Sequence, residues 1–148
     1  MPVIELRNLC KTYDTGATQV HALRPTNLSL EEGQFVAIMG PSGSGKSTML
    51  NLLGMLDRPT AGEYVLDGLN VAEFDDNRLS ETRCRRIGFI FQSFNLFSNY
   101  TILENVCVPM RYAERLTEPQ MLERAAMLLT SVGLGDRLTH TPNELSGG

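Results

Sequence analysis

The chain has 148 residues, of which 42% are hydrophobic and 20% are charged, and this composition is that of one globular domain rather than of a fibrous or disordered chain. The formal net charge is −4, so no overall positive field exists to hold nucleic acid or an anionic membrane. The apolar runs are short and interrupted, whereas a membrane-spanning helix needs about 18 or more consecutive apolar residues.

The first third of the chain predicts a meandering series of strands. Short strands are expected at residues 3–6, 19–23 and 27–30, with a turn at residues 13–16. Residues 35–39 are apolar without alternation, which is typical of a strand buried on both faces in a parallel sheet. We expect residues 35–39 to form a central strand.

The period of the apolar residues changes after this strand. From Lys46 they fall at helical spacing until Arg58 and Pro59 stop the pattern. A short strand is then expected at residues 63–66, a polar surface helix at residues 75–85, and a second buried strand at residues 87–91.

The last third of the chain predicts two helices, near residues 102–115 and 118–132. The second helix opens with the capping-box pattern of Thr117 and Gln120 and ends at Gly133. No repeat, linker or low-complexity segment interrupts the chain, so residues 1–148 are expected to form one domain.

The N-terminus and the cysteines indicate the compartment. No charged segment leads into an apolar run with a cleavage site. Cys10, Cys84 and Cys107 are widely spaced and form no CxxC pair, which favours reduced thiols over a disulfide framework or a metal site. We therefore expect a cytoplasmic protein.

A glycine-rich loop carries the strongest functional signal. Its residues satisfy the G-x-x-x-x-G-K-[ST] pattern between a predicted buried strand and a predicted helix. Glycines allow consecutive backbone N–H groups to turn toward nucleotide phosphates, and the following helix start adds partial positive charge. Lys46 is expected to reach the β- and γ-phosphates, and the Ser47 hydroxyl to coordinate Mg²⁺. The expected ATP-binding residues of this segment are Gly40, Pro41, Ser42, Gly43, Ser44, Gly45, Lys46, Ser47 and Thr48.

This loop does not identify the class of enzyme, because kinases, GTPases and transport ATPases share it. Tyr13 is placed to stack on an adenine or, equally, to pack on the sheet. Gln92 directly follows the second predicted buried strand, where it lies beside a nucleotide site or is a surface amide. The terminal Leu145, Ser146, Gly147 and Gly148 also make an ordinary turn or helix cap.

Taken together, the order of Tyr13, the phosphate loop, Gln92 and the terminal Leu-Ser-Gly-Gly resembles the ATP-binding cassette (ABC) transporter ATPases over the whole chain. Three further stretches, at residues 20–23, 52–63 and 104–110, resemble the lipoprotein-releasing and macrolide-export group of that family.

The resemblance implies an α/β fold, the P-loop NTPase fold of the ABC type, here as a partial nucleotide-binding domain. Its parts are an N-terminal β subdomain, part of the parallel core sheet and a helical subdomain from residue 76 to about residue 132 that contacts a membrane partner. It also implies ATP and Mg²⁺ as ligands, a homodimer or a pair with another ATPase subunit, and an integral membrane permease. The protein would then lie peripherally on the inner face of the cell membrane, with no nucleic acid partner.

The same resemblance assigns a role to each motif. Tyr13 would stack on adenine, and Lys46 and Ser47 would hold phosphate and Mg²⁺. Gln92 would be the catalytic residue that contacts Mg²⁺ or the attacking water. The signature residues Leu145, Ser146, Gly147 and Gly148 would face the γ-phosphate of the ATP bound by the partner subunit.

The sequence departs from the family pattern at its end. It stops at Gly148, inside the signature, and contains no apolar strand ending in Asp-Glu and no later switch His. We therefore expect ATP turnover only in a completed sequence, coupled to export or substrate release through the permease. The alternative is a catalytically inactive ATP-binding module; a nucleotide or metabolite kinase leaves Gln92 and the signature without a role.

Two further expectations concern the surface. Without a further sheet strand, residues 35–39 and 87–91 would lose packing partners, so we expect poor solubility or partial folding of the 148-residue chain. The basic run at residues 83–86 is compatible with anionic lipid or nucleic acid, but at the end of a polar helix it favours a solvated face.

Overall fold

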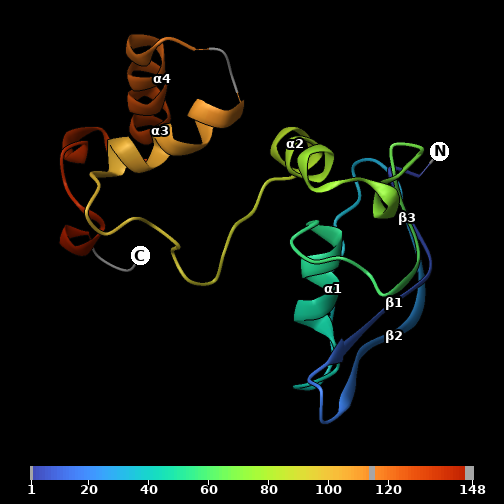
Figure 1. The fold of residues 1–148 in the computed structure, drawn as a ribbon. Coiled ribbons are helices and arrows are strands. Elements are labelled where there is room, and N and C mark those ends of the chain that lie inside the picture. Colours follow the sequence, from blue (N-terminus) through green and yellow to red (C-terminus); the bar gives the residue numbers. More distant parts are fainter. Residues whose placement is uncertain (1, 114–115, 146–148) are drawn as a thin grey trace. The chain divides into compact units, whose positions relative to one another are not determined.

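The computed structural model describes residues 2–113 and 116–145 (Figure 1). They divide into two compact units, Met1–Ile87 and Gly88–Gly148. Each unit has its own cluster of buried hydrophobic side chains, and each is described separately below.

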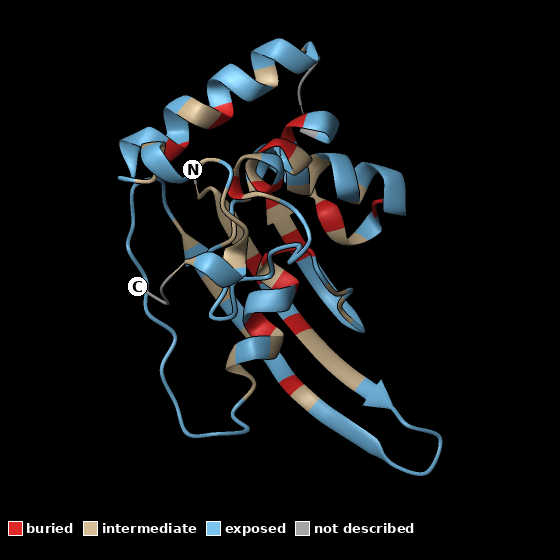
Figure 2. Ribbon diagram, turned by 90° about the vertical axis from the view of Figure 1, so that its left-hand side faces the viewer, coloured by how far each residue is buried: buried red, intermediate tan, exposed pale blue. Residues whose placement is uncertain are grey.

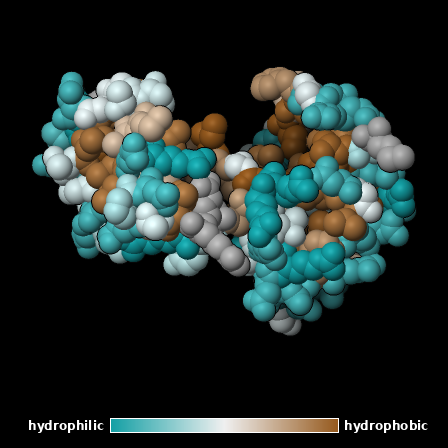
Figure 3. All heavy atoms as spheres, turned by 90° about the horizontal axis from the view of Figure 1, so that it is seen from above, coloured by the Kyte–Doolittle hydropathy of each residue, from teal (hydrophilic) through white to brown (hydrophobic). Residues whose placement is uncertain are grey.

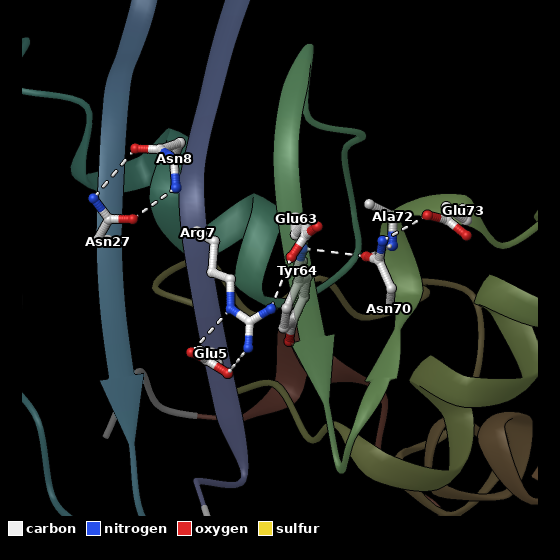
Figure 4. A network of polar contacts seen from close by, with 9 residues as sticks. All are labelled: Glu5, Arg7, Asn8, Asn27, Glu63, Tyr64, Asn70, Ala72 and Glu73. Atoms are coloured by element: carbon white, nitrogen blue, oxygen red, sulfur yellow. Dashed lines mark hydrogen bonds and ion pairs between the residues drawn. The ribbon is translucent and has the colours of Figure 1, made fainter.

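A four-stranded antiparallel sheet forms the base of the first unit, in the order β2-β1-β3-β4. Its strands are β1 (Ile4–Asp14), β2 (Gln19–Leu30), β3 (Ala61–Leu66) and β4 (Leu69–Asn70). Polar side chains tie its three longer strands together (Figure 4): Arg7 donates to Glu5 and Glu63, and Asn27 accepts from the Asn8 N–H at 2.8 Å.

Strand β2 corrects two sequence predictions. Residues 19–23 and 27–30 were expected as separate strands but belong to one. Tyr13, expected in a turn, pairs with Val20 across the hairpin of β1 and β2. Pro25 has no N–H to donate and lies where the register of this hairpin shifts. Pairing with β1 therefore carries the strand past the residue that interrupts its sequence pattern.

Helix α1 (Lys46–Leu53) packs on the sheet and is shorter than predicted. The helical pattern was expected to continue to Arg58, but Gly54 caps the helix and Met55 has a φ of 53°, in the left-handed region. The N–H groups of Leu56 and Asp57 then turn back to the Asn51 carbonyl. The buried residues of the first unit, red in Figure 2, are Leu6, Leu9, Leu23, Met49, Leu52, Met55, Tyr64, Leu66, Val71 and Phe74.

A short 3₁₀ helix, η1 (Val71–Glu73), leads into helix α2 (Asp76–Arg86). Helix α2 has no buried residue, which confirms the predicted polar surface helix. Asp75 caps it by accepting the Arg78 N–H at 2.7 Å. The basic run at its end is held within the unit: Arg83 donates to the Met55 carbonyl, and Arg86 pairs with Asp67 at 3.3 Å.

The prediction of two buried strands is wrong. Residues 35–39 and 87–91 have no regular secondary structure, and the Phe35 side chain is 98% exposed. Among the described residues no strand pairs with either segment, so their backbone groups join no ladder of hydrogen bonds. The sheet that does form is antiparallel. Figure 3 shows hydrophobic side chains (brown) on the surface of each unit.

The second unit is helical. Helices α3 (Ile102–Ala113) and α4 (Glu118–Ser131) pack together through Cys107, Met110 and Ala125, and short 3₁₀ turns η2 (Gly135–Arg137) and η3 (Pro142–Glu144) follow. The Thr117 N–H donates to Gln120 at 2.9 Å, which confirms the capping box. Residues 114–115, where the predicted first helix ends, lie outside the described residues.

Buried Asn105 anchors the segment before α3. Its side chain accepts the Phe97 N–H at 2.8 Å and donates to the carbonyls of Phe97 and Tyr100.

Within the described ranges, no helix is both long and apolar enough to cross a membrane.

Buried Tyr64 makes the stability of the first unit sensitive to alkali. Burial, with a smaller contribution from the Asp67 charge, raises the pKa of Tyr64 from 10.0 to about 12. The folded protein favours the neutral phenol, so Tyr64 contributes fully to the free energy of unfolding below pH 10. This contribution, about 2–3 kcal/mol, is lost as the pH rises from 10 to 12. We expect urea unfolding to show this loss in the native protein and not in Tyr64→Phe; parallel pH curves for the two proteins would contradict it.

Candidate nucleotide-binding site

The glycine-rich loop at residues 40–47 leads directly into α1. Gly40, Gly43 and Gly45 all have positive φ, at 156°, 78° and 90°. A Cβ on Gly45 would lie 2.5 Å from the Ala22 carbonyl oxygen of β2, and one on Gly40 would lie 2.7 Å from the Ser44 Oγ. The loop therefore needs glycine at residue 45, because both the backbone angle and the fixed Ala22 carbonyl exclude a side chain there. At Gly40 the close atom is the end of the flexible Ser44 side chain.

Lys46 is the first residue of α1. Its Nζ donates to the carbonyls of Gly40 at 2.8 Å and Pro41 at 2.7 Å, so the ammonium lies across the loop. The Met49 N–H donates to the Gly45 carbonyl at 2.8 Å and closes the first helical turn. The first N–H groups of a helix have no partner inside it and carry partial positive charge, so the Lys46 ammonium and this helix start together favour an anion.

An open pocket of about 350 Å³ lies between the loop and β2, a volume within the range of small-molecule sites. It is lined by Val20, His21, Ala22, Ser42, Gly43, Gly45, Lys46, Ser47 and Thr48. The Lys46 ammonium and the N–H groups at the start of the helix are donors that fit a phosphate chain. The Ser47 hydroxyl is an oxygen ligand of the kind that Mg²⁺ accepts beside phosphate oxygens. In the part of the chain that the structure describes, no three His, Cys, Asp or Glu residues cluster as a metal cage.

Tyr13 lies at the end of β1, beside this pocket. It pairs with Val20, a pocket residue, and its hydroxyl interacts with Thr48 of α1. The hydroxyl also donates to Asp57 at 2.7 Å, and this hydrogen bond raises the pKa of Tyr13. Tyr13 as a whole residue stays 38% exposed, so part of its surface remains open to a ligand.

Asp57 is the charged partner of this tyrosine. Burial alone would raise the pKa of its carboxyl, but hydrogen bonds from Lys11 and Tyr13 outweigh burial and hold the pKa below its ordinary value. Neither Lys11 nor Asp57 was predicted from the sequence as a site residue, since 46 positions separate them. The pocket wall from β2 was not predicted either, because it follows from the pairing of Val20 with Tyr13 in the folded sheet.

The other predicted site residues lie in the second unit. Gln92 is exposed, in a segment without regular secondary structure. Leu145 follows η3 and donates its N–H to the Pro142 carbonyl at 3.2 Å. Ser146, Gly147 and Gly148 lie outside the described residues. Tyr13 and the phosphate loop are thus brought together within the first unit, and the roles of Gln92 and the signature stay predictions.

Replacing Gly45 with Ala is expected to weaken ATP binding roughly 5- to 30-fold, because the left-handed backbone costs about 1–2 kcal/mol for a residue with a Cβ and this Cβ would also displace the loop from the Ala22 carbonyl of β2. Gly43→Ala is the control and is expected to lose less: it lies in the same loop with a φ of 78°, but no heavy atom lies within 4 Å of the added Cβ. Isothermal titration with ATP measures both variants, and equal effects would show that the close approach to β2 is unimportant.

Comparison with known proteins agrees with this geometry. The family model described as ABC transporter matches residues 23–148. An uncharacterized ABC transporter ATP-binding protein of Thermotoga maritima is 51% identical over 146 residues, which are 99% of this chain and 62% of that protein. The macrolide export ATP-binding/permease protein MacB of Hyphomonas neptunium is 49% identical over 147 residues, which are 99% of this chain and 23% of that protein.

Solved structures give the same result. The ATP-binding cassette MJ0796, in a dimeric post-hydrolysis state bound to ADP and Pi, is similar with a TM-score of 0.88 and 44% identity over 97% of this chain and 63% of that one; MJ0796 is a protein of Methanocaldococcus jannaschii. The chain thus spans less than two thirds of these relatives. The match over most of its length confirms the α/β P-loop fold and the resemblance to the macrolide-export group, and the chain belongs to the ABC transporter family as an ATP-binding domain.

Proposed function

We propose that this chain is the ATP-binding part of an export ATPase of the macrolide-exporter type, a partial nucleotide-binding domain over residues 1–148. The observation that carries the proposal is the phosphate loop with Lys46 at the start of α1, beside an open pocket. The similarity to proteins named for macrolide export supports the transport role.

Within the site, the chain's own residues bind and orient the nucleotide. The loop N–H groups and the Lys46 ammonium hold the β- and γ-phosphates, and Tyr13 offers its ring to the base. Ser47 would hold Mg²⁺, which when bound neutralises phosphate charge.

The proposed assembly has two ATP-binding domains and an integral membrane permease. Each ATP would lie between the phosphate loop of one domain and the signature at residues 145–148 of the other, as a homodimer or with another ATPase subunit. Dimeric structures of MJ0796 support the pairing, and the name of the MacB relatives joins an ATP-binding part to a permease. This arrangement would locate the domain on the inner face of the cell membrane.

Isothermal titration of the 148-residue chain with Mg²⁺-ATP tests the proposal. We expect Mg²⁺-ATP to bind through the phosphate loop, with the Lys46 ammonium contributing to the affinity. Absence of ATP binding would exclude the proposed function.

A further inference from the structure

The Tyr13 ring has few constraints of its own. It lies near the turn of the β1–β2 hairpin, where Tyr13 is 38% exposed and Val20 is its strand neighbour. Its hydroxyl, however, donates to Asp57 Oδ2 at 2.7 Å. A ring that must meet a base at a fixed distance from the phosphates needs such an external constraint.

Asp57 is itself fixed to the end of α1. Its N–H donates to the Asn51 carbonyl at 3.3 Å, and its Oδ1 accepts the Arg58 N–H at 2.7 Å. Helix α1 begins at Lys46 of the phosphate loop. The phosphate site therefore lies at the start of α1, and the segment that follows the helix, tied back to Asn51, carries the carboxylate that holds Tyr13.

Lys11 completes the arrangement from β1. Its Nζ lies 2.6 Å from Asp57 Oδ1, donates to the Arg58 carbonyl at 2.7 Å, and sits 4.8 Å from the centre of the Tyr13 ring. The side chains of Lys11 and Asp57 are only 13% and 27% exposed. Such a shielded pair holds its geometry better than ion pairs on the open surface do.

We infer that Asp57 is a positioning residue for the base of the nucleotide: with Lys11 it holds the Tyr13 ring at a set distance from the phosphate loop. This inference rests on the proposed ATP-binding function. It predicts that the Asp57 contacts contribute to the binding of ATP but not to the binding of a phosphate chain without a base.

The test compares ATP with inorganic tripolyphosphate as ligands of the purified protein, by isothermal titration. Tyr13→Phe keeps the ring and removes only the hydrogen bond, and Asp57→Ala removes the acceptor. We expect both to weaken ATP binding roughly three- to tenfold, the worth of one hydrogen bond, with tripolyphosphate affinity unchanged. Asp57→Asn, whose amide oxygen still accepts, is expected to lose less.

Tyr64→Phe is the matched control. It removes a phenol hydrogen bond of the same length, 2.7 Å, to the Leu53 carbonyl of the same helix, away from Tyr13. We expect its ratio of ATP to tripolyphosphate affinity to equal that of the native protein. A purely structural role for Asp57 would instead lower both affinities together, and that result would overturn the inference.

The remaining outcomes separate this inference from the proposed function. If Tyr13→Ala weakens ATP binding while Tyr13→Phe and Asp57→Ala do not, the ring stacks on the base without help and only the inference fails. If the native protein binds ATP no better than tripolyphosphate, or binds neither, the base site itself is absent and the inference fails with it. Because Tyr13→Phe is a mild change, the test holds even if Asp57→Ala does not fold.

Discussion

Replacing Lys46 with Ala is expected to weaken the binding of Mg²⁺-ATP by roughly 10- to 100-fold. A hydrogen bond to a charged group contributes about 1.5–3 kcal/mol, which corresponds to this range of affinity. The Lys46 ammonium donates to the carbonyls of Gly40 and Pro41, so it already lies against the loop that would bind the phosphates. Isothermal titration measures the affinity, and circular dichroism shows whether the fold persists.

Arg7→Ala is the control for this variant. It also removes one positive charge from the first unit, but Arg7 is 56% exposed at its side chain and pairs with Glu5 and Glu63 on the sheet, outside the pocket lining. We expect its ATP affinity to stay within about twofold of the native value, since surface ion pairs contribute little. Native affinity in Lys46→Ala would contradict the proposed function.

Replacing Leu9 with Ala is expected to lower the free energy of unfolding of the first unit by about 2–5 kcal/mol. The Leu9 side chain is 0% exposed and belongs to the core between the sheet and α1. Domains of this size are stable by only about 5–15 kcal/mol, so this single change removes a large part of the margin. Urea unfolding followed by far-ultraviolet circular dichroism measures it.

Hydrogen exchange shows which elements lose stability in Leu9→Ala. The cores of the two units share no residue among those described, so we expect amide protection to fall in β1, β2 and β3 and to stay unchanged in α4. Leu69→Ala on β4 is the control, because that side chain is 54% exposed and its loss should cost under about 0.5 kcal/mol. Equal effects of the two variants would show that Leu9 is not a core residue.

The sequence by itself determined the features that depend on near neighbours along the chain. The phosphate loop, the start of α1 at Lys46 and the capping box of Thr117 were all predicted and found. Each is set by backbone angles and hydrogen bonds among residues three or four apart, which a local pattern records. The family followed from the order of such motifs.

Tertiary structure alone decided what depends on distant partners. Residues 35–39 have the pattern of a buried strand, yet a strand exists only where another strand pairs with it, and no described strand does. Conversely, pairing with β1 extends β2 past Pro25. The contact of Tyr13 with Asp57 joins positions 44 apart, and because a carboxylate and a phenol meet there through folding rather than through spacing, no local pattern in the sequence announces it.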